Sequence, residues 1–354
     1  MHITRNWSLR LALKGGLAII ALRVIIAYLS TDALSLISQA ANISTIRHAR
    51  PVHAPSHLPR TANRTLGFER VIAISLPERS DKRDALDLMA SLTEFDIDWE
   101  DGVKASSIAE KAVPYGISLD RAKENFLGSW RGHMNIIRRI VETGISSALI
   151  LEDDVDWDVH LKSQLSNIAQ GTRHVLGESA SSFPPDSPYG DGWDVLWLGH
   201  CGEYAIQDDE TMPSYSRVTQ WVDWGAFPPH TRLVHLSGLP VCSFAYAVSQ
   251  KAAKKILYAL SIDGLHTEFD NALAALCRDG RSDASYHLKC LSVNPTIIFH
   301  HKPKGRLTGD SDINSQGEDG GERQEGFTES IKWSMRLNLK NILLGRPLEQ
   351  QFDD

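Results

Sequence analysis

The sequence has few cysteines and no paired CxxC motif. Four cysteines in 354 residues are too few for a disulfide-dense scaffold, and nothing indicates a zinc finger. The chain also lacks the excess of positive charge that binding to nucleic acid needs. Nine of its 37 Lys and Arg residues but only two of its 44 acids lie in residues 1–70, so residues 71–354 carry 28 basic and 42 acidic side chains. A body this acidic repels a phosphate backbone, so we expect no nucleic acid partner.

The composition is otherwise that of a globular protein with one long apolar segment near its start. Hydrophobic residues make up 42% of the chain and charged residues 23%, enough apolar material for a sizeable core. Residues 17–37 are mostly apolar, and only basic charges precede Asp32. This pattern is typical of a signal anchor or a signal peptide. The lack of a small-residue cleavage site favours an uncleaved anchor, although Arg23 costs about 2.5–3.5 kcal/mol on insertion. A cleaved signal and an amphipathic surface helix are the alternatives.

The apolar segment divides the chain into parts. The segment after it contains prolines and two glycosylation sequons, at Asn42 and Asn63, and reads as an extended stem. This plan predicts a single-pass type II protein of the Golgi or endoplasmic reticulum membrane, with its globular domain in the lumen. There the four cysteines can form disulfides, and three pairings are open. The predicted parts are a cytosolic tail (1–16), a signal-anchor helix (17–37), a stem (38–68), a globular domain (69–305) and a C-terminal tail (306–354) with an amphipathic helix at 328–344.

Strand-like and helix-like segments alternate in the globular domain. Such alternation is typical of an α/β fold, with a mainly parallel central sheet and helices on both faces. Two irregular segments, 177–192 and 203–237, interrupt the pattern and are predicted to be loops. The predicted strands are 70–76, 147–151, 193–198, 241–248 and 291–299, and the predicted helices are 82–92, 129–143, 249–260 and 268–278.

Three acids directly follow the apolar strand 147–151. Glu152, Asp153 and Asp154 therefore lie at the carboxyl end of a strand, the edge of an open α/β sheet where ligands bind. Strand alternation places Glu152 and Asp154 on one side and Asp153 on the other. Two carboxylates on one side can hold a divalent cation, which would let an acidic protein bind an anionic diphosphate. A solvated acidic turn is the alternative.

These acids and several other segments resemble glycosyltransferase family 25, which includes bacterial lipooligosaccharide galactosyltransferases and the collagen galactosyltransferases. The resemblance runs from about residue 70 to 305. Two positions depart from the family pattern, because Ser129 stands for a cysteine and Gly132 for a serine. The matching segments are 74–83 (ISLPERSDKR), 128–133 (GSWRGH), 151–155 (LEDDV), 194–199 (DVLWLG) and 245–249 (AYAVS).

The resemblance implies an inverting hexosyltransferase of the GT-A fold. Its donor would be a nucleotide-sugar, which the resemblance to the family suggests is UDP-galactose. Its acceptor would be a glycan or a glycoprotein. Mn²⁺ or another divalent cation would stabilise negative charge on the leaving diphosphate. We expect Glu152 and Asp154 to hold this cation. A histidine after the last strand, His300 or His301, would be a further ligand.

Inversion also needs a carboxylate that takes the proton of the acceptor hydroxyl. Asp270 is the first candidate for this base and Glu268 the second. Both residues open a helix after a loop, where a side chain can face a cleft. Acids are also favoured in the first turn of any helix, which is the alternative interpretation. The predicted donor-binding residues are Leu76, Arg79, Arg83, His133 and Asp153.

Two other functions compete with glycosyl transfer. A metal-dependent phosphoesterase would also cluster carboxylates at strand ends, but it gathers ligands from several strands, and only one strong acidic cluster is present. A non-catalytic lectin-like luminal protein would have no need of the three acids.

Overall fold

The computed structural model describes residues 60–118, 120, 125–178, 187–204, 231–280, 286–313 and 321–352. These residues belong to the unit Leu58–Asp354. The predicted anchor at 17–37 and most of the stem lie outside them. Within the described ranges, no helix is both long and apolar enough to cross a bilayer.

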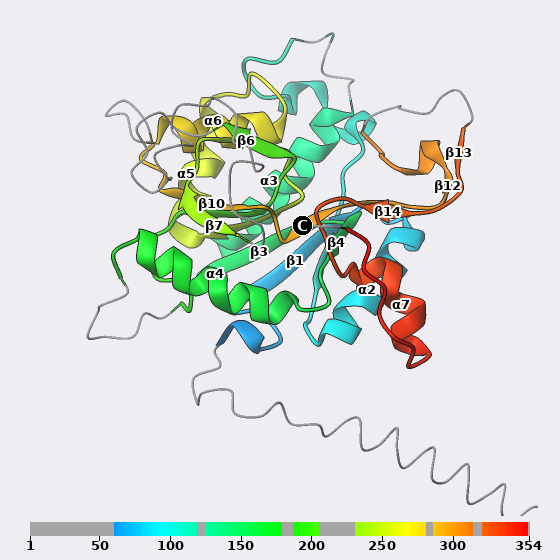
Figure 1. Ribbon diagram of the computed structural model, residues 1–354. Coiled ribbons are helices and arrows are strands. Elements are labelled where there is room, and N and C mark those ends of the chain that lie inside the picture. The colour runs from blue at the N-terminus through cyan, green and yellow to red at the C-terminus, as the bar shows by residue number, and fades with distance from the viewer. Residues whose placement is uncertain are drawn as a thin grey trace, which may run out of the picture. The chain divides into compact units, whose positions relative to one another are not determined.

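A seven-stranded sheet forms the centre of the domain (Figure 1). Its strands are β1 (Arg70–Ser75), β2 (Asp98–Asp101), β3 (Ser147–Glu152), β5 (Val195–Gly199), β7 (Leu233–Leu236), β9 (Ala245–Ser249) and β10 (Cys290–Asn294). They lie in the order β2-β1-β3-β9-β5-β10-β7. β1 is parallel to β2 and β3, and β10 is parallel to β5. β9, however, runs antiparallel between β3 and β5, and β7 is antiparallel to β10.

Five strands, β1, β2, β3, β5 and β10, therefore run in one direction, as a mainly parallel sheet requires, whereas β7 and β9 run against them and make the sheet mixed. The reversed direction of β9 follows from where it starts. Ala245, the first residue of β9, pairs with Gly199, the last residue of β5, so β9 starts at the edge of the sheet where β5 ends. A connection that starts and ends at one edge joins antiparallel strands, whereas a parallel pair needs a crossover.

Helices cover both faces of the sheet, and each face has its own apolar core. The helices are α2 (Ser80–Thr93), α3 (Phe126–Thr143), α4 (Leu161–Val175), α5 (Gln250–Leu257), α6 (Phe269–Asp279) and α7 (Met335–Leu343). Val71 and Ala73 of β1 join the core beneath α2, α4 and α7, whereas Ile72 and Ile74 join the core beneath α3, α5 and α6. This alternation is the period of two that a strand buried on both faces requires.

The predicted strand 291–299 is two strands in different sheets. β10 ends at Asn294, and after Pro295 the chain enters β11 (Ile298–Lys302). β11 pairs with β4 (Val155–Trp157) on one side and β14 (Phe327–Thr328) on the other. Two further ribbons pair β6 (Gly202–Tyr204) with β8 (Leu239–Val241), and β12 (Gly305–Arg306) with β13 (Glu322–Arg323).

The C-terminal segment is joined to β4 by the carboxylate of Asp156, the middle residue of that strand. This side chain is fully buried. It accepts hydrogen bonds from Thr328 Oγ1 at 2.6 Å, from the Arg336 N–H at 2.9 Å and from the hydroxyl of Ser334. α7 starts one residue after Ser334 and packs beside α2 (Figure 1). The segment is therefore part of the domain's packing, within the predicted helical range 328–344.

Candidate active site

The acids at the end of β3 lie where two cavities meet. Glu152, Asp153 and Asp154 line a first cavity of about 400 Å³, which also contacts the end of β1, the start of α2, and α3. Glu152 and Asp154 also line a second cavity of about 370 Å³, which Asp153 does not reach. The second cavity extends to the disulfide Cys201–Cys242, the start of α6 and β11. Strand alternation does not place Asp153 on the opposite side, because β3 ends at Glu152, all three acids line the first cavity, and Asp153 and Asp154 both contact Lys82.

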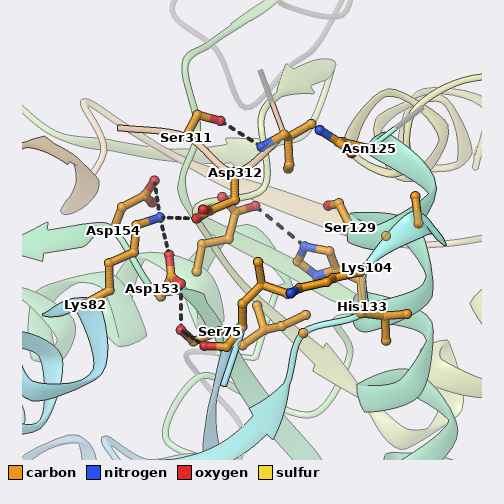
Figure 2. A pocket seen from close by; sticks show the side chains of 18 of the residues that line it. Ser75, Lys82, Lys104, Asn125, Ser129, His133, Asp153, Asp154, Ser311 and Asp312 are labelled. Carbon is orange, nitrogen blue, oxygen red and sulfur yellow. Dashed lines mark hydrogen bonds and ion pairs between the residues drawn. The ribbon is translucent and has the colours of Figure 1, made fainter. Parts of the chain in front are cut away.

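A buried lysine faces the acids in the first cavity (Figure 2). The ammonium of Lys82 lies 2.7 Å from Oδ1 of Asp153 and 3.7 Å from Oδ2 of Asp154. It also lies 3.1 Å from Oδ2 of Asp312, a residue of the segment after β12. Burial disfavours its charge, but the surrounding carboxylates outweigh that effect and raise the pKa of Lys82. Asp153 is fixed from its other side, where Oδ2 accepts a 2.7 Å hydrogen bond from Ser75 Oγ.

Glu152 is held by side chains from neighbouring elements. Its Oε1 accepts a 2.8 Å hydrogen bond from Ser243 Oγ and lies 3.6 Å from Nε2 of His133. The His133 ring is buried, with Nδ1 2.9 Å from the Tyr246 hydroxyl and its plane stacked on Phe269. Burial disfavours the ionised glutamate, but the contacts with His133 and Ser243 outweigh it and lower the pKa of Glu152. Glu152 is thus a charged carboxylate in a fixed position.

Asp154 differs from its neighbours because half of its carboxylate has no partner. Oδ1 is buried and accepts no hydrogen bond from the described part of the chain. Burial and then the nearby charges of Glu152 and Asp153 raise the pKa of Asp154 to about 7, against the opposing charges of Lys82 and Lys302. A buried acceptor with no donor is an energetic cost that a bound cation would remove.

The donor set fits a hard divalent cation that keeps part of its own hydration. In the described ranges no three His, Cys, Asp or Glu side chains are already gathered around one point. Such a ready cage is not required, since Mg²⁺-like ions are commonly bound by one or two carboxylates together with water and substrate phosphates. Asp154 and Glu152 can supply these carboxylates.

The structure separates the two neighbouring histidines. His300 lines the second cavity, and burial followed by the charge of Lys302 lowers its pKa to about 4, so its ring is neutral at pH 7. His301 faces the other side of β11, where Nδ1 lies 2.9 Å from Thr328 Oγ1 and the side chain is buried. His301 does not line either cavity, so the expectation of a metal ligand applies to His300 alone.

Both predicted base candidates lie in the second cavity. Oδ2 of Asp270 accepts a 3.0 Å hydrogen bond from the N–H of Cys242, and burial raises the pKa of Asp270. Glu268 precedes α6, and its Oε2 accepts a 2.6 Å hydrogen bond from Thr267 Oγ1. Sequence alone does not separate these two acids, and the structure brings both to the same cavity.

The predicted donor-binding residues divide into two groups. Leu76, His133 and Asp153 line the first cavity. Arg79 and Arg83 are not among its lining groups in the described structure. Arg79 binds Asp81 at 2.8 Å and Asp312. Arg83 binds Ser75 O at 2.7 Å and Asp101 at 2.6 Å, and its guanidinium lies over the Trp99 ring.

One of the two departures from the family pattern reaches the site. Ser129 lines both cavities. Gly132 packs on Ile74, where an added Cβ would lie 2.4 Å from the terminal Cδ1, so a serine here would require the end of the Ile74 side chain to move. Lys82 and Asp312 are site residues that the sequence did not reveal. Lys82 belongs to the basic motif 74–83, whereas Asp312 lies in a polar segment without a motif.

The comparisons with known proteins agree with the motifs. No family model matches the chain. Procollagen galactosyltransferase 1 of Danio rerio is 30% identical over 220 residues, which cover 58% of this chain and 30% of that protein. Procollagen galactosyltransferase 1-B of Xenopus laevis is 23% identical over 264 residues, or 68% of this chain and 37% of that protein. Inactive glycosyltransferase 25 family member 3 of Homo sapiens is 28% identical over 166 residues, or 42% of this chain and 25% of that protein. The resemblance to glycosyltransferase family 25 is thereby confirmed.

A solved structure is only distantly similar. A glycosyltransferase involved in the glycosylation of the major capsid of PBCV-1 matches with a TM-score of 0.31 and 10% identity, over 65% of this chain and 91% of that one. The chain spans about a third of the length of the curated relatives it matches, 30% and 37% of the two procollagen galactosyltransferases. Because some relatives are named as inactive, the case for activity has to come from the site.

Proposed function

We propose that this protein is an inverting, divalent-metal-dependent hexosyltransferase that moves a sugar from a nucleotide-sugar donor to a glycan or glycoprotein acceptor. The observation that carries the proposal is the pair Glu152 and Asp154 on the wall shared by two cavities, with one buried carboxylate oxygen left unpartnered by the described residues. Transfer between two bound substrates needs two adjoining sites and a means of neutralising a diphosphate. Similarity to procollagen galactosyltransferases supports UDP-galactose as the donor.

The carboxylate pair would bind the cation, and the first cavity would bind the nucleotide. Mn²⁺ or another divalent cation, when bound, neutralises charge on the leaving diphosphate. Glu152 and Asp154 would hold it, with His300 as a neutral nitrogen ligand. Leu76 gives the first cavity an apolar wall beside the acids, and the contact between His133 and Glu152 fixes the position of one ligand.

The second cavity would bind the acceptor. Asp270 is proposed to take the proton of the acceptor hydroxyl as that oxygen attacks the anomeric carbon. Its raised pKa favours this role, because a carboxylate is a stronger base when its pKa lies nearer the working pH. Glu268 lies beside it as the second candidate.

The proposed location is the lumen of the Golgi or endoplasmic reticulum, with residues 17–37 as the anchor. The disulfides Cys201–Cys242 and Cys277–Cys290 support an oxidising compartment. Together the two disulfides use all four cysteines of the chain, and they correspond to one of the three pairings that the sequence left open.

The test is release of nucleoside diphosphate from a panel of nucleotide-sugars. The full-length chain, purified in detergent, is assayed with Mn²⁺ or with EDTA, beside Asp154→Asn. Asp84→Asn is the matched control, because it makes the same change at an exposed position of α2. We expect one donor to be cleaved, with a loss of roughly 100-fold or more on chelation or in Asp154→Asn.

Three outcomes would reject the proposal. A rate of donor cleavage that is unchanged by EDTA and by Asp154→Asn would exclude the metal-dependent mechanism. Metal-dependent hydrolysis of simple phosphate esters without sugar transfer would identify a phosphoesterase instead. Glycan binding that survives Asp154→Asn, without turnover of any donor, would identify a lectin-like protein.

A further inference from the structure

We infer that the ammonium of Lys82 is the position at which the first cavity binds a phosphate group of its ligand, and that Asp312 occupies this position while no such ligand is bound. The inference rests on the proposed function for the identity of the ligand, a nucleoside diphosphate. The buried ammonium of Lys82, from α2, is shared between carboxylates of the turn after β3 and of the segment after β12.

Asp312 is the carboxylate around Lys82 that can leave most readily. Its side chain is 32% exposed, against 21% for Asp154 and 11% for Asp153. Asp153 is also tied to Ser75, within the end of β1. Asp312 comes from a segment 230 residues further along the chain, with no strand pairing of its own in the described structure. Its departure would break side-chain contacts and leave the sheet intact.

A phosphate group can take the place of Asp312 because the two groups are chemically similar. A carboxylate oxygen and a phosphate oxygen are both anionic acceptors for an ammonium group, and lysine binds phosphate as a point charge. If a phosphate replaces Asp312, Lys82 keeps the same number of anionic partners. The exchange also removes one negative charge from a cavity that still contains Glu152, Asp153 and Asp154. It therefore reduces the repulsion that an incoming diphosphate meets.

Arg79 holds Asp312 in place from outside the cavity. Its guanidinium contacts the Asp312 carboxylate and donates a 3.0 Å hydrogen bond to the carbonyl of Gly309. Ser311 and Ile313, on either side of Asp312, line both cavities. The segment 309–313 is thus attached to the start of α2 by charge contacts and lines both cavities.

The experiment measures binding of inorganic pyrophosphate and of UDP, in the presence of Mn²⁺, to the full-length chain. Asp312→Asn removes the competing charge at nearly constant shape. If Asp312 occupies Lys82 in nine molecules of ten, its removal strengthens the apparent affinity about tenfold. We expect that gain in the wild-type background and its loss when Lys82→Met is combined with Asp312→Asn. Asp84→Asn makes the same charge change at an exposed position of α2 and should alter the affinity less than twofold.

Arg79→Gln provides a second test that does not depend on the folding of a Lys82 variant. It removes a positive charge, yet it should strengthen pyrophosphate binding because it loosens Asp312. Weaker binding in Arg79→Gln would place the anion site at Arg79 and overturn the assignment to Lys82. No gain in Asp312→Asn, or an equal gain with and without Lys82, would also overturn it.

Failure of this inference and failure of the proposed function give different results. If no nucleotide-sugar is turned over but Asp312→Asn still strengthens pyrophosphate binding through Lys82, the anion site is correct and the transferase is not. If donor turnover needs Asp154 and Mn²⁺ but Asp312→Asn leaves binding unchanged, the transferase is correct and the exchange at Lys82 is not.

Discussion

The backbone N–H of Cys242 donates a 3.0 Å hydrogen bond to Oδ2 of Asp270, so a disulfide and the candidate base belong to one local structure. Cys201, the other half of the disulfide, follows β5 by two residues. The bond therefore ties the chain leaving β5 to the backbone that positions Asp270. Both cysteines line the second cavity.

Removal of this disulfide should lower turnover as well as stability. In Cys201→Ser/Cys242→Ser the backbone of Cys242 gains freedom, and the geometry of Asp270 depends on it. We expect kcat per folded molecule to fall roughly tenfold or more, since misplacing a catalytic group by about 1 Å can cost 100-fold. Initial rates, corrected for the folded fraction from thermal unfolding, measure the effect.

The second disulfide is the matched control. Cys277 and Cys290 join α6 to β10 and are not among the residues lining either cavity. Chain-entropy estimates give about 4 kcal/mol for the Cys201–Cys242 loop and about 3 kcal/mol for the Cys277–Cys290 loop, so both double variants lose stability. Equal losses of kcat in the two double variants would show that the lower turnover comes from the loss of a disulfide in general and not from a change in the position of Asp270.

Asp270→Asn should lower kcat by roughly 100-fold to 10,000-fold with little change in donor KM, since a general base acts in the transition state. The pH profile gives a second readout. With Mn²⁺ kept saturating at each pH, so that protonation of Asp154 does not limit activity, kcat should fall with falling pH through a value above that of an ordinary aspartate, because burial raises the pKa of Asp270 and a base works only when deprotonated. Glu268→Gln is the comparison. If Glu268→Gln removes this acidic limb and Asp270→Asn leaves it, the base is Glu268.

The sequence predicts the parts of this fold that depend on local patterns. The apolar run before Glu152 and the amphipathic pattern before Gly144 are strong, and β3 (Ser147–Glu152) and α3 (Phe126–Thr143) lie within a few residues of the predicted ranges. The direction of β9 is set by the edge of the sheet at which it starts, which periodicity does not encode. The strand 291–299 is divided for a similar reason, since β10 and β11 pair with different partners.

The candidate site divides in the same way. The acids are adjacent in sequence and stand out as a motif. Lys82 and Asp312 are 230 residues apart, and only the fold brings them into contact. Neither residue can therefore be assigned to the site from the sequence. His300 and His301 are equivalent in sequence, but strand alternation directs one into the second cavity and the other toward Thr328. That alternation has to be counted from the true start of β11, which the predicted range did not locate.

Mn²⁺ binding should weaken as the pH falls below about 7. The pKa of Asp154 is raised to about 7, and a carboxylate must lose its proton to bind a metal. Protons therefore compete with the ion, and the apparent affinity should fall about tenfold between pH 8 and pH 6. Titration calorimetry on the full-length chain measures this, with Asp154→Asn expected to abolish the binding.

The two neighbouring histidines provide the control for the metal site. His300→Gln should weaken Mn²⁺ binding, because this ring lines the cavity shared with Glu152 and Asp154. His301→Gln should leave the affinity unchanged, because its ring faces Thr328. The reverse order of effects would place the ion on the other side of β11 and contradict the assignment of the carboxylate pair.

Asp156→Ala should detach the C-terminal segment and destabilise the whole domain. It removes the acceptor for the hydroxyls of Thr328 and Ser334 and for the N–H of Arg336, all in a buried environment. Each buried donor left unpaired costs about 1–3 kcal/mol, so we expect a loss of about 3 kcal/mol or more in the free energy of unfolding. Urea unfolding measures the loss, and limited trypsin digestion should release fragments from the region of α7. Glu110→Gln, an exposed acid far along the chain, should change neither result. If Asp156→Ala unfolds like the wild type and resists trypsin equally, the segment is held by the apolar contacts of Met335 and Ile331.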